Sequence, residues 1–133
     1  MSEPLFLAFA DVEKLHRLSI ERFGGTHGLR DPGGAEAAVQ QPKHTYFYGG
    51  GDLFDVAAAY AFHIAQAQAF LDGNKRAAVA ACFAFLERNE VRVLFDWQAI
   101  HAAMIALAER SLDKPGLAAL LRKEAILQGW REA

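Results

Sequence analysis

The hydrophobic residues of this chain recur mainly at helical spacing. In the first third of the sequence they lie three to five positions apart, at Val12, Leu15, Leu18 and Phe23. This spacing predicts an amphipathic helix. Asp11 is expected to cap its start. Gly24 is expected to end it, because glycine adopts the left-handed backbone conformation found at helix C-termini.

The next segment is less regular. A short helix is expected over residues 35–41, and Pro42 closes it because proline interrupts the hydrogen bonds of a helix. Residues 43–51 end in three glycines and contain three aromatic residues, Tyr46, Phe47 and Tyr48. Aromatic residues beside a run of glycines are typical of a small hairpin or flap. An ordinary surface connection with an aromatic anchor is the alternative.

Four further helices are predicted in the rest of the chain. They run from Asp52 or Asp55 to about residue 69, from 74 to about 89, from Asp96 to about 112, and from Asp113 to near 129. Aspartate is a preferred helix cap. Between the second and third of these helices, residues 90–95 alternate as a strand fragment does.

The helix expected at 74–89 contains a run, 77–86, that has no strongly polar side chain. A helix that is apolar all round is typically buried, so this one is expected to be the central helix. The chain is therefore predicted to form one all-α domain over residues 1–133, with about six helices around a buried central helix and a small flap.

Composition narrows the classes of function. The 133 residues are 53% hydrophobic and carry a formal net charge of −2, so bulk electrostatics favour neither nucleic acid nor an anionic membrane. The single cysteine, Cys82, excludes an internal disulfide and fits a reducing compartment. We expect a cytoplasmic protein with no signal peptide, no membrane span and no direct DNA binding.

A compact polar stretch, residues 70–76, precedes the predicted central helix. The N-terminus of a helix has unpaired backbone N–H groups and a partial positive charge. Lys75 and Arg76 would add two cations to that end. This combination predicts an anion site, and phosphate is the anion that such sites commonly bind. A helix start that is merely solvated is the alternative reading of these residues alone.

The other polar residues of the stretch are also compatible with phosphate chemistry. Asp72 is a hard oxygen ligand of the kind that Mg²⁺ takes when it bridges phosphate oxygens. Gly73 lets the backbone turn tightly and approach an anion. Asn74 can donate from its side-chain amide or cap the helix.

Residues 68–76 resemble the signature of the Fic/Doc family, His-x-Phe-x-Asp/Glu-x-Asn-Gly/Lys-Arg, and the lysine after asparagine is typical of its Doc branch. Further matching motifs follow the family's order over residues 11–89: they lie at 11–16, 23–25, 27–31, in the alanine-rich helix before Pro42, and at 85–89. The resemblance implies an all-helical Fic fold and an enzyme that transfers part of a nucleoside triphosphate to a protein hydroxyl.

The two branches differ in the group that they transfer. Fic proteins of the usual type transfer AMP, whereas the Doc-type resemblance implies a kinase that phosphorylates translation elongation factor Tu. AMP-transferring members often carry a second arginine where this chain has Val79, which favours the kinase. The chain also lacks the family's inhibitory motif, Ser/Thr-x-x-x-Glu-Gly/Asn, so the resemblance implies restraint by a separate antitoxin protein.

The resemblance assigns roles to individual residues. It makes Asp72 the Mg²⁺ ligand, residues 73–76 the phosphate-binding residues for ATP with Arg76 also catalytic, and residues 46–51 the flap that docks the target polypeptide. The signature histidine, which is the general base, is replaced by Gln68. An amide has no basicity near neutral pH, and loss of a positioned base costs about 10²–10⁴-fold in rate.

No other histidine is expected to replace the base. His63 lies five residues before Gln68 and would point about 140° away from it on a helix. His16, within the first predicted helix, is expected to be packed or hydrogen-bonded. Three explanations of Gln68 remain open: a natural pseudoenzyme, a slow enzyme with substrate-assisted proton transfer, and an introduced inactivating substitution.

The sequence thus predicts a Doc-like toxin that transfers phosphate from ATP to elongation factor Tu and is attenuated or inactive at Gln68. The alternatives are a non-catalytic nucleotide- or partner-binding protein on the same fold, and an AMP-transferring Fic protein.

Overall fold

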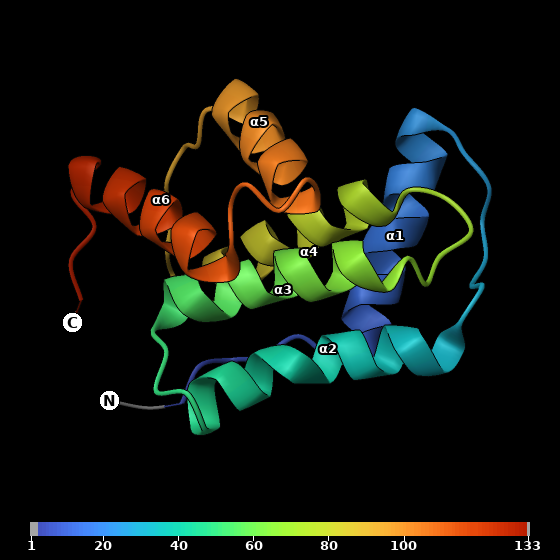
Figure 1. The fold of residues 1–133 in the computed structure, drawn as a ribbon, viewed down its shortest axis with the longest axis horizontal. Helices are drawn as coiled ribbons and strands as arrows, with labels where there is room; N and C mark the ends of the chain where they lie inside the picture. The colour runs from blue at the N-terminus through green and yellow to red at the C-terminus, as the bar shows by residue number, and fades with distance from the viewer. Residues whose placement is uncertain (1–2, 133) are drawn as a thin grey trace.

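The computed structural model describes residues 3–132, which form six α-helices (Figure 1). In chain order these are α1 (Phe9–Phe23), α2 (Pro32–Phe47), α3 (Leu53–Ala67), α4 (Asn74–Arg88), α5 (Trp97–Ala108) and α6 (Lys114–Leu127). Within the described part of the chain, the only extended pairing is an isolated antiparallel bridge between Leu29 and Phe70. The prediction of an all-α fold is confirmed.

Helix α3 is the most enclosed element of the fold. It packs against α2, α4, α5 and α6, and Figure 1 shows it running through the middle of the molecule. Most of its buried side chains are small, and small side chains let the neighbouring helices approach closely. The buried residues of α3 are Phe54, Val56, Ala57, Ala58, Ala59, Tyr60, Ala61 and Ile64.

Helix α4 was predicted to be buried on all sides, and that prediction is wrong. One face is buried, including Ala78, Cys82 and Phe85, whereas Val79 and Phe83 on the other face are half-buried. Apolar side chains are common on protein surfaces, so the run of apolar residues does not require burial on every side. The central position belongs to α3.

Helix α2 is longer than predicted at both ends. It starts at Pro32 rather than residue 35, because Asp31 caps it and accepts a hydrogen bond from Gly34 N at 2.9 Å. It also continues through Pro42, which is buried against the core with Val39. Tertiary packing of this face therefore outweighs the backbone hydrogen bond that proline cannot make.

The hairpin or extended flap expected at residues 43–51 is consequently absent from the described structure. Tyr46 and Phe47 form the last turn of α2, and Tyr48 is its C-cap. Gly50 adopts φ +66° in the short connection to α3, where Asp52 caps the next helix as predicted.

The start of α1 also differs from the prediction. Ala8 occupies the N-cap position, and Asp11 lies in the first turn. The Asp11 carboxylate accepts a hydrogen bond from Ala8 N at 2.7 Å, so it satisfies a free backbone group from inside the helix rather than from its cap. Gly24 ends the helix as predicted.

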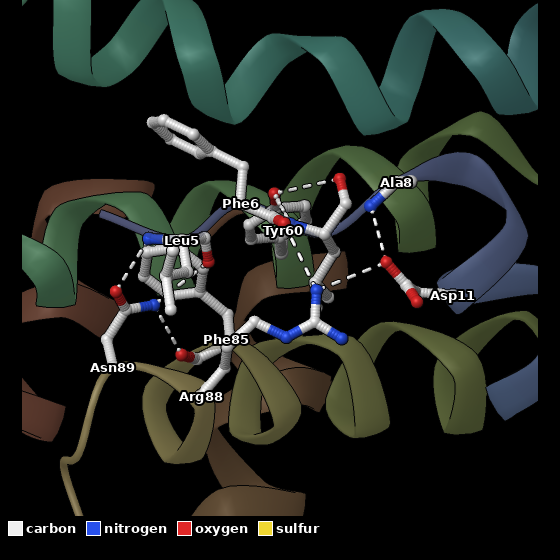
Figure 2. Close-up of polar contacts among 9 residues, drawn as sticks. Leu5, Phe6, Ala8, Asp11, Tyr60, Phe85, Arg88 and Asn89 are labelled. Atoms are coloured by element: carbon white, nitrogen blue, oxygen red, sulfur yellow. Dashed lines mark hydrogen bonds and ion pairs between the residues drawn. The ribbon is translucent and has the colours of Figure 1, made fainter. Parts of the chain in front are cut away.

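The segment before α1 is anchored to the far end of α4 (Figure 2). Asn89 pairs with both backbone groups of Leu5, at 2.7 and 3.0 Å, and Arg88 reaches Phe6 O and the Asp11 carboxylate at 3.2 Å each. The Tyr60 hydroxyl accepts a hydrogen bond from Leu7 N at 2.8 Å. These contacts join the N-terminal segment to α3 and α4.

The C-terminal part follows the predicted order with shorter helices. Asp96 and Asp113 cap α5 and α6 as predicted. The strand fragment predicted at residues 90–95 is wrong, because the backbone of Leu94 is satisfied by the side-chain amide of Gln128 rather than by a neighbouring strand. In the part of the chain described, no helix has the length and apolar character needed to span a bilayer.

Candidate functional site

Two loops that are distant in sequence lie together at one end of the fold. The α1–α2 connection and the α3–α4 loop meet at the C-terminal end of α3 (Figure 1). Leu71 N donates to Gly28 O at 3.0 Å, and Arg30 N donates to Ala69 O at 2.7 Å. These bonds flank the bridge between Leu29 and Phe70 and hold the signature-like loop against the N-terminal half.

His16, a residue of α1, packs against the α3–α4 loop and supports it. Only 3% of its surface is exposed, its ring stacks on Phe70 at a centroid distance of 3.9 Å, and its Nε2 lies 2.7 Å from Asp72 O. Because a carbonyl oxygen only accepts, this nitrogen must carry the proton. The expected packed and hydrogen-bonded role of His16 is confirmed.

Asp72 is exposed at the tip of this loop, and two backbone groups orient its carboxylate. One oxygen accepts from Thr26 N at 3.2 Å and the other from Gly73 N at 2.9 Å. Each carboxylate oxygen therefore keeps a lone pair for another ligand. Among residues 3–132, no three histidine, cysteine or acidic side chains cluster in a metal-binding arrangement. A cation here would take one protein carboxylate and fill its shell with other oxygens, as Mg²⁺ does with phosphates and water.

Arg76 is held on the same side of the loop as Asp72, against the end of α1. Its guanidinium donates to Gly24 O at 2.9 Å and to Ser19 O at 3.3 Å. A guanidinium has five N–H donors, so three remain for an anion. The Ser19 hydroxyl beside it is buried without a hydrogen-bond partner.

Gly25 shows how closely these groups approach one another. A Cβ atom built at Gly25 would lie 2.7 Å from a carboxylate oxygen of Asp72 and 3.1 Å from a guanidinium nitrogen of Arg76. Its φ of +117° also disfavours any other residue. Glycine at this position therefore lets the Asp72 carboxylate and the Arg76 guanidinium lie close together.

The start of α4 has the features of an anion site. Gly73 is its N-cap, with φ +73° and no side chain to satisfy the first N–H groups, and the first turn contains no acidic residue. The carboxamide of Asn74 turns back to the loop instead, where it bonds Phe70 N at 2.9 Å and Phe70 O at 3.0 Å. Asn74 thus fixes the loop and keeps one amide N–H; its predicted contact with phosphate stays a prediction.

Gln68 and Lys75 face the opposite side of the loop. They line a pocket of about 460 Å³ with side chains of α3, α5 and the α5–α6 connection, and neither Asp72 nor Arg76 is part of that lining. Gln68 is the C-cap of α3 in the left-handed conformation, φ 52°. Its amide donates to Ala65 O at 3.0 Å. The expected site residues therefore divide between two faces.

None of this chain's histidines, all of which lie within the described range, lines the pocket beside Gln68. His63 Nε2 lies 3.0 Å from the Lys114 ammonium. Burial, and then the charge of Lys114, lowers the pKa of His63 to about 4. It is therefore an acceptor for Lys114 and far too weakly basic to replace a general base that works near pH 7.

The aromatic residues predicted to dock a target lie at the other end of α3. Tyr48 is 86% exposed at the end of α2, and the 15 residues of α3 separate this end from Gln68. At 1.5 Å per residue the separation is about 22 Å. A docking role for Tyr46, Phe47 and Tyr48 stays a prediction.

Sequence reasoning missed the contribution of the N-terminal half to this site. His16, Gly25 and Thr26 contact or crowd the α3–α4 loop, and Ser19 contacts Arg76 in the first turn of α4. Helical spacing predicted that α1 is a helix, but it did not indicate which part of the chain α1 contacts. The one available signal was the ordered series of short motifs over residues 11–31, which indicates that this segment belongs with the signature.

Comparison with known proteins identifies the family of this chain. The family model described as Fic/DOC family matches residues 6–86. The chain is 36% identical over 110 residues to "Protein kinase doc" of Escherichia phage P1, which covers 82% of this chain and 86% of that protein. It is 39% identical over 105 residues to "Toxin Doc" of Mycolicibacterium smegmatis (strain ATCC 700084 / mc(2)155), which covers 74% and 79%. The chain belongs to the Fic/DOC family.

Proposed function

We propose that this chain is a Doc-type toxin of a toxin–antitoxin pair, built to transfer phosphate from ATP to a hydroxyl of elongation factor Tu and attenuated because Gln68 replaces the general base. The observation that carries the proposal is the convergence of Asp72 and Arg76 on Gly25, beside an uncapped helix start. The relatives named as a protein kinase and a toxin support the class of activity.

The residues on the α1-facing side fit ATP with Mg²⁺. Asp72 would hold the metal through its free lone pairs, and the three unused donors of Arg76 would bind phosphate oxygens. The backbone N–H groups at the start of α4 would add to the anion site. Bound in this way, ATP would supply the phosphoryl group, and the protein would contribute position and positive charge.

Gln68 accounts for the attenuation. Its amide cannot take the proton of an acceptor hydroxyl near pH 7. It can accept or donate a hydrogen bond and so orient that hydroxyl, although one of its two N–H groups is engaged by Ala65 O. Turnover would then depend on proton transfer to water or to the substrate, at a rate about 10²–10⁴-fold below that of an enzyme with a positioned base.

The test compares the chain with its Gln68→His variant. Each would be incubated with radiolabelled ATP, Mg²⁺ and purified elongation factor Tu, and the initial rate of label transfer measured. We expect Gln68→His to be faster by about 10²–10⁴-fold. Gln40→His is the control, because Gln40 is exposed on α2 and does not line this pocket. It should leave the rate at the level of the unmodified chain.

Failure of Gln68→His to transfer label would overturn the kinase assignment. Equal rates for the unmodified chain and Gln68→His would instead show that the residue at position 68 does not limit the rate of transfer. Transfer of the nucleotide rather than the terminal phosphate, seen with label on the α-phosphate, would favour the AMP-transferring alternative.

The division of the site residues between two faces favours one second candidate, a nucleotide-binding protein without turnover. The α1-facing groups are complete, whereas Gln68 bonds its own helix. In that case ATP would bind, as measured by calorimetry with Arg76→Ala as the control, and Gln68→His would bring no transfer. Either candidate implies an antitoxin partner, which co-expression with a small neighbouring antitoxin and co-purification would test.

A further inference from the structure

The pocket beside Gln68 adjoins the candidate site, and neither Asp72 nor Arg76 is part of its lining. Its volume of about 460 Å³ lies within the range of ligand pockets, roughly 300–1,000 Å³. Its walls are mostly apolar, and its polar groups lie where α3, α4 and the α5–α6 connection meet. Prominent members of the lining are Phe62, Met104, Leu107, Leu112, Lys75 and Arg110.

The position of this pocket relative to the proposed phosphate- and metal-binding residues indicates its occupant. Arg76 and Asp72 face α1, whereas Gln68 and Lys75 face α5. Lys75 and Arg76 are consecutive residues in the first turn of α4, so an anion bound at this helix start would lie between the two faces. In phosphoryl transfer the attacking and leaving oxygens lie roughly in line on opposite sides of phosphorus. With the nucleotide on the α1 side, the acceptor must approach from the α5 side.

We infer that the pocket between α3, α4, α5 and the α5–α6 connection receives the acceptor polypeptide, and that it binds an apolar side chain close to the hydroxyl that is phosphorylated. This inference rests on the proposed function and deepens it by assigning the acceptor site. The acceptor oxygen forms a bond to the terminal phosphorus while the bond from that phosphorus to the bridging oxygen breaks. ADP leaves with that electron pair, and the hydroxyl proton passes to water in this chain or to the introduced histidine in Gln68→His.

The lining also defines the chemistry of the acceptor. Phe62, Met104 and Leu107 provide an apolar wall for an aliphatic or aromatic side chain. Lys75 and Arg110 give the polar end of the pocket two positive charges against the single negative charge of Asp113. The Asp113 carboxylate is already engaged, since it caps α6 through Gly116 N at 2.8 Å. An acceptor segment with an acidic residue near its apolar side chain and hydroxyl therefore fits best.

The test fills the pocket from its exposed edge. Ala108 is the last residue of α5, is exposed, and lines the pocket, so Ala108→Trp narrows the space without disturbing the core. Ala102→Trp is the matched control, because Ala102 is also exposed on α5 but is not part of the lining. Both changes are made in full-length chain that carries Gln68→His, so that transfer to elongation factor Tu can be measured.

We expect Ala108→Trp to raise the KM for the acceptor about tenfold or more, as for other changes in the shape of apolar specificity pockets. The dissociation constant for ATP with Mg²⁺, measured by calorimetry, should stay unchanged. Ala102→Trp should alter neither quantity.

Two results would overturn the acceptor site and leave the proposed function standing. An unchanged KM in Ala108→Trp would show that the acceptor does not use the pocket. A weaker affinity for ATP would show that the nucleotide occupies it. Absence of transfer by the Gln68→His parent would overturn the proposed function itself, and the acceptor site with it.

Discussion

The two faces of residues 68–76 differ in how completely they are built. On the α1-facing side, backbone groups of α1 and of the α1–α2 connection hold Asp72 and Arg76 at 2.9–3.3 Å, and a glycine is required to make room. On the α5-facing side, Gln68 bonds its own helix and Lys75 borders an open pocket. We call the α1-facing side the fixed face, because hydrogen bonds already hold its side chains. We call the α5-facing side the hollow face, because it borders the pocket.

This difference separates two requirements of a phosphotransferase. Binding a charged nucleotide benefits from donors that are already oriented, because no energy is then spent on reorganising them. Accepting a polypeptide requires space and, for fast turnover, a base within reach of the hydroxyl. Under the proposed function, Asp72 and Arg76, which backbone groups of the N-terminal half hold in place, would meet the first requirement. The second would lack its base, because Gln68 stands at that position.

The largest effect is expected from removing the cation of the fixed face. Arg76→Ala deletes two hydrogen bonds from a charged donor to Ser19 O and Gly24 O, and should lower the free energy of unfolding by about 1–3 kcal/mol. Lys75→Ala, its neighbour on the hollow face, should change stability by no more than about 0.5 kcal/mol. Urea denaturation measures both, and equal losses would erase the distinction between the faces.

A smaller effect is expected from crowding the fixed face without removing any of its groups. Gly25→Ala places a methyl group 2.7 Å from the Asp72 carboxylate. The resulting displacement should weaken binding of ATP with Mg²⁺ by roughly ten- to hundredfold, as small misplacements at reacting sites do.

Gly24→Ala is the control for this change. Gly24 also has a positive φ, +89°, but nothing lies within 4 Å of a Cβ built there. Calorimetry should therefore show a much weaker effect than in Gly25→Ala. If the two variants lost the same affinity, backbone strain rather than the approach of Asp72 and Arg76 would explain the loss.

The smallest effect concerns acid and the hollow face. Because the pKa of His63 is lowered from 6.5 to about 4, the unfolded chain binds a proton in this range that the folded chain excludes. Stability therefore falls as the pH drops from 7 towards 4. With a discount for the half-exposed ring, the loss is roughly 1–2 kcal/mol.

His63→Gln should flatten this part of the pH profile of unfolding, and His101→Gln, which changes an exposed ring on α5, should not. Protonated His63 would also repel Lys114, 3.0 Å away and next to the pocket residue Asp113. As the pH is lowered, the affinity for the acceptor should therefore fall at a higher pH than the affinity for ATP. A profile that His63→Gln leaves unaltered would remove this link.

Local sequence patterns were sufficient for the number and order of the helices and for three of their six N-caps. Asp52, Asp96 and Asp113 cap α3, α5 and α6 as their positions predict, because a side-chain oxygen two or three residues before a free N–H needs no distant partner. The pattern failed where distant contacts outweigh local preference. Pro42 was expected to end a helix, but packing of α2 on α3 carries the helix five residues further.

The residues of the candidate site could be named before the fold was known. Asp72, Lys75, Arg76 and the missing histidine at Gln68 are all read from one continuous stretch of nine residues. Only the tertiary structure decided which way each side chain faces. Consecutive residues on a helix point about 100° apart, so Lys75 and Arg76 are adjacent in sequence and yet serve different faces.

The partners of these side chains were likewise set by tertiary contacts. Thr26 and Gly25 reach Asp72 from 46 and 47 positions earlier in the chain, and the pocket beside Gln68 is closed by α5 and the α5–α6 connection more than 30 positions later. The chemistry of the site is thus local, whereas its division into a fixed face and a hollow face depends on how distant helices pack around α3.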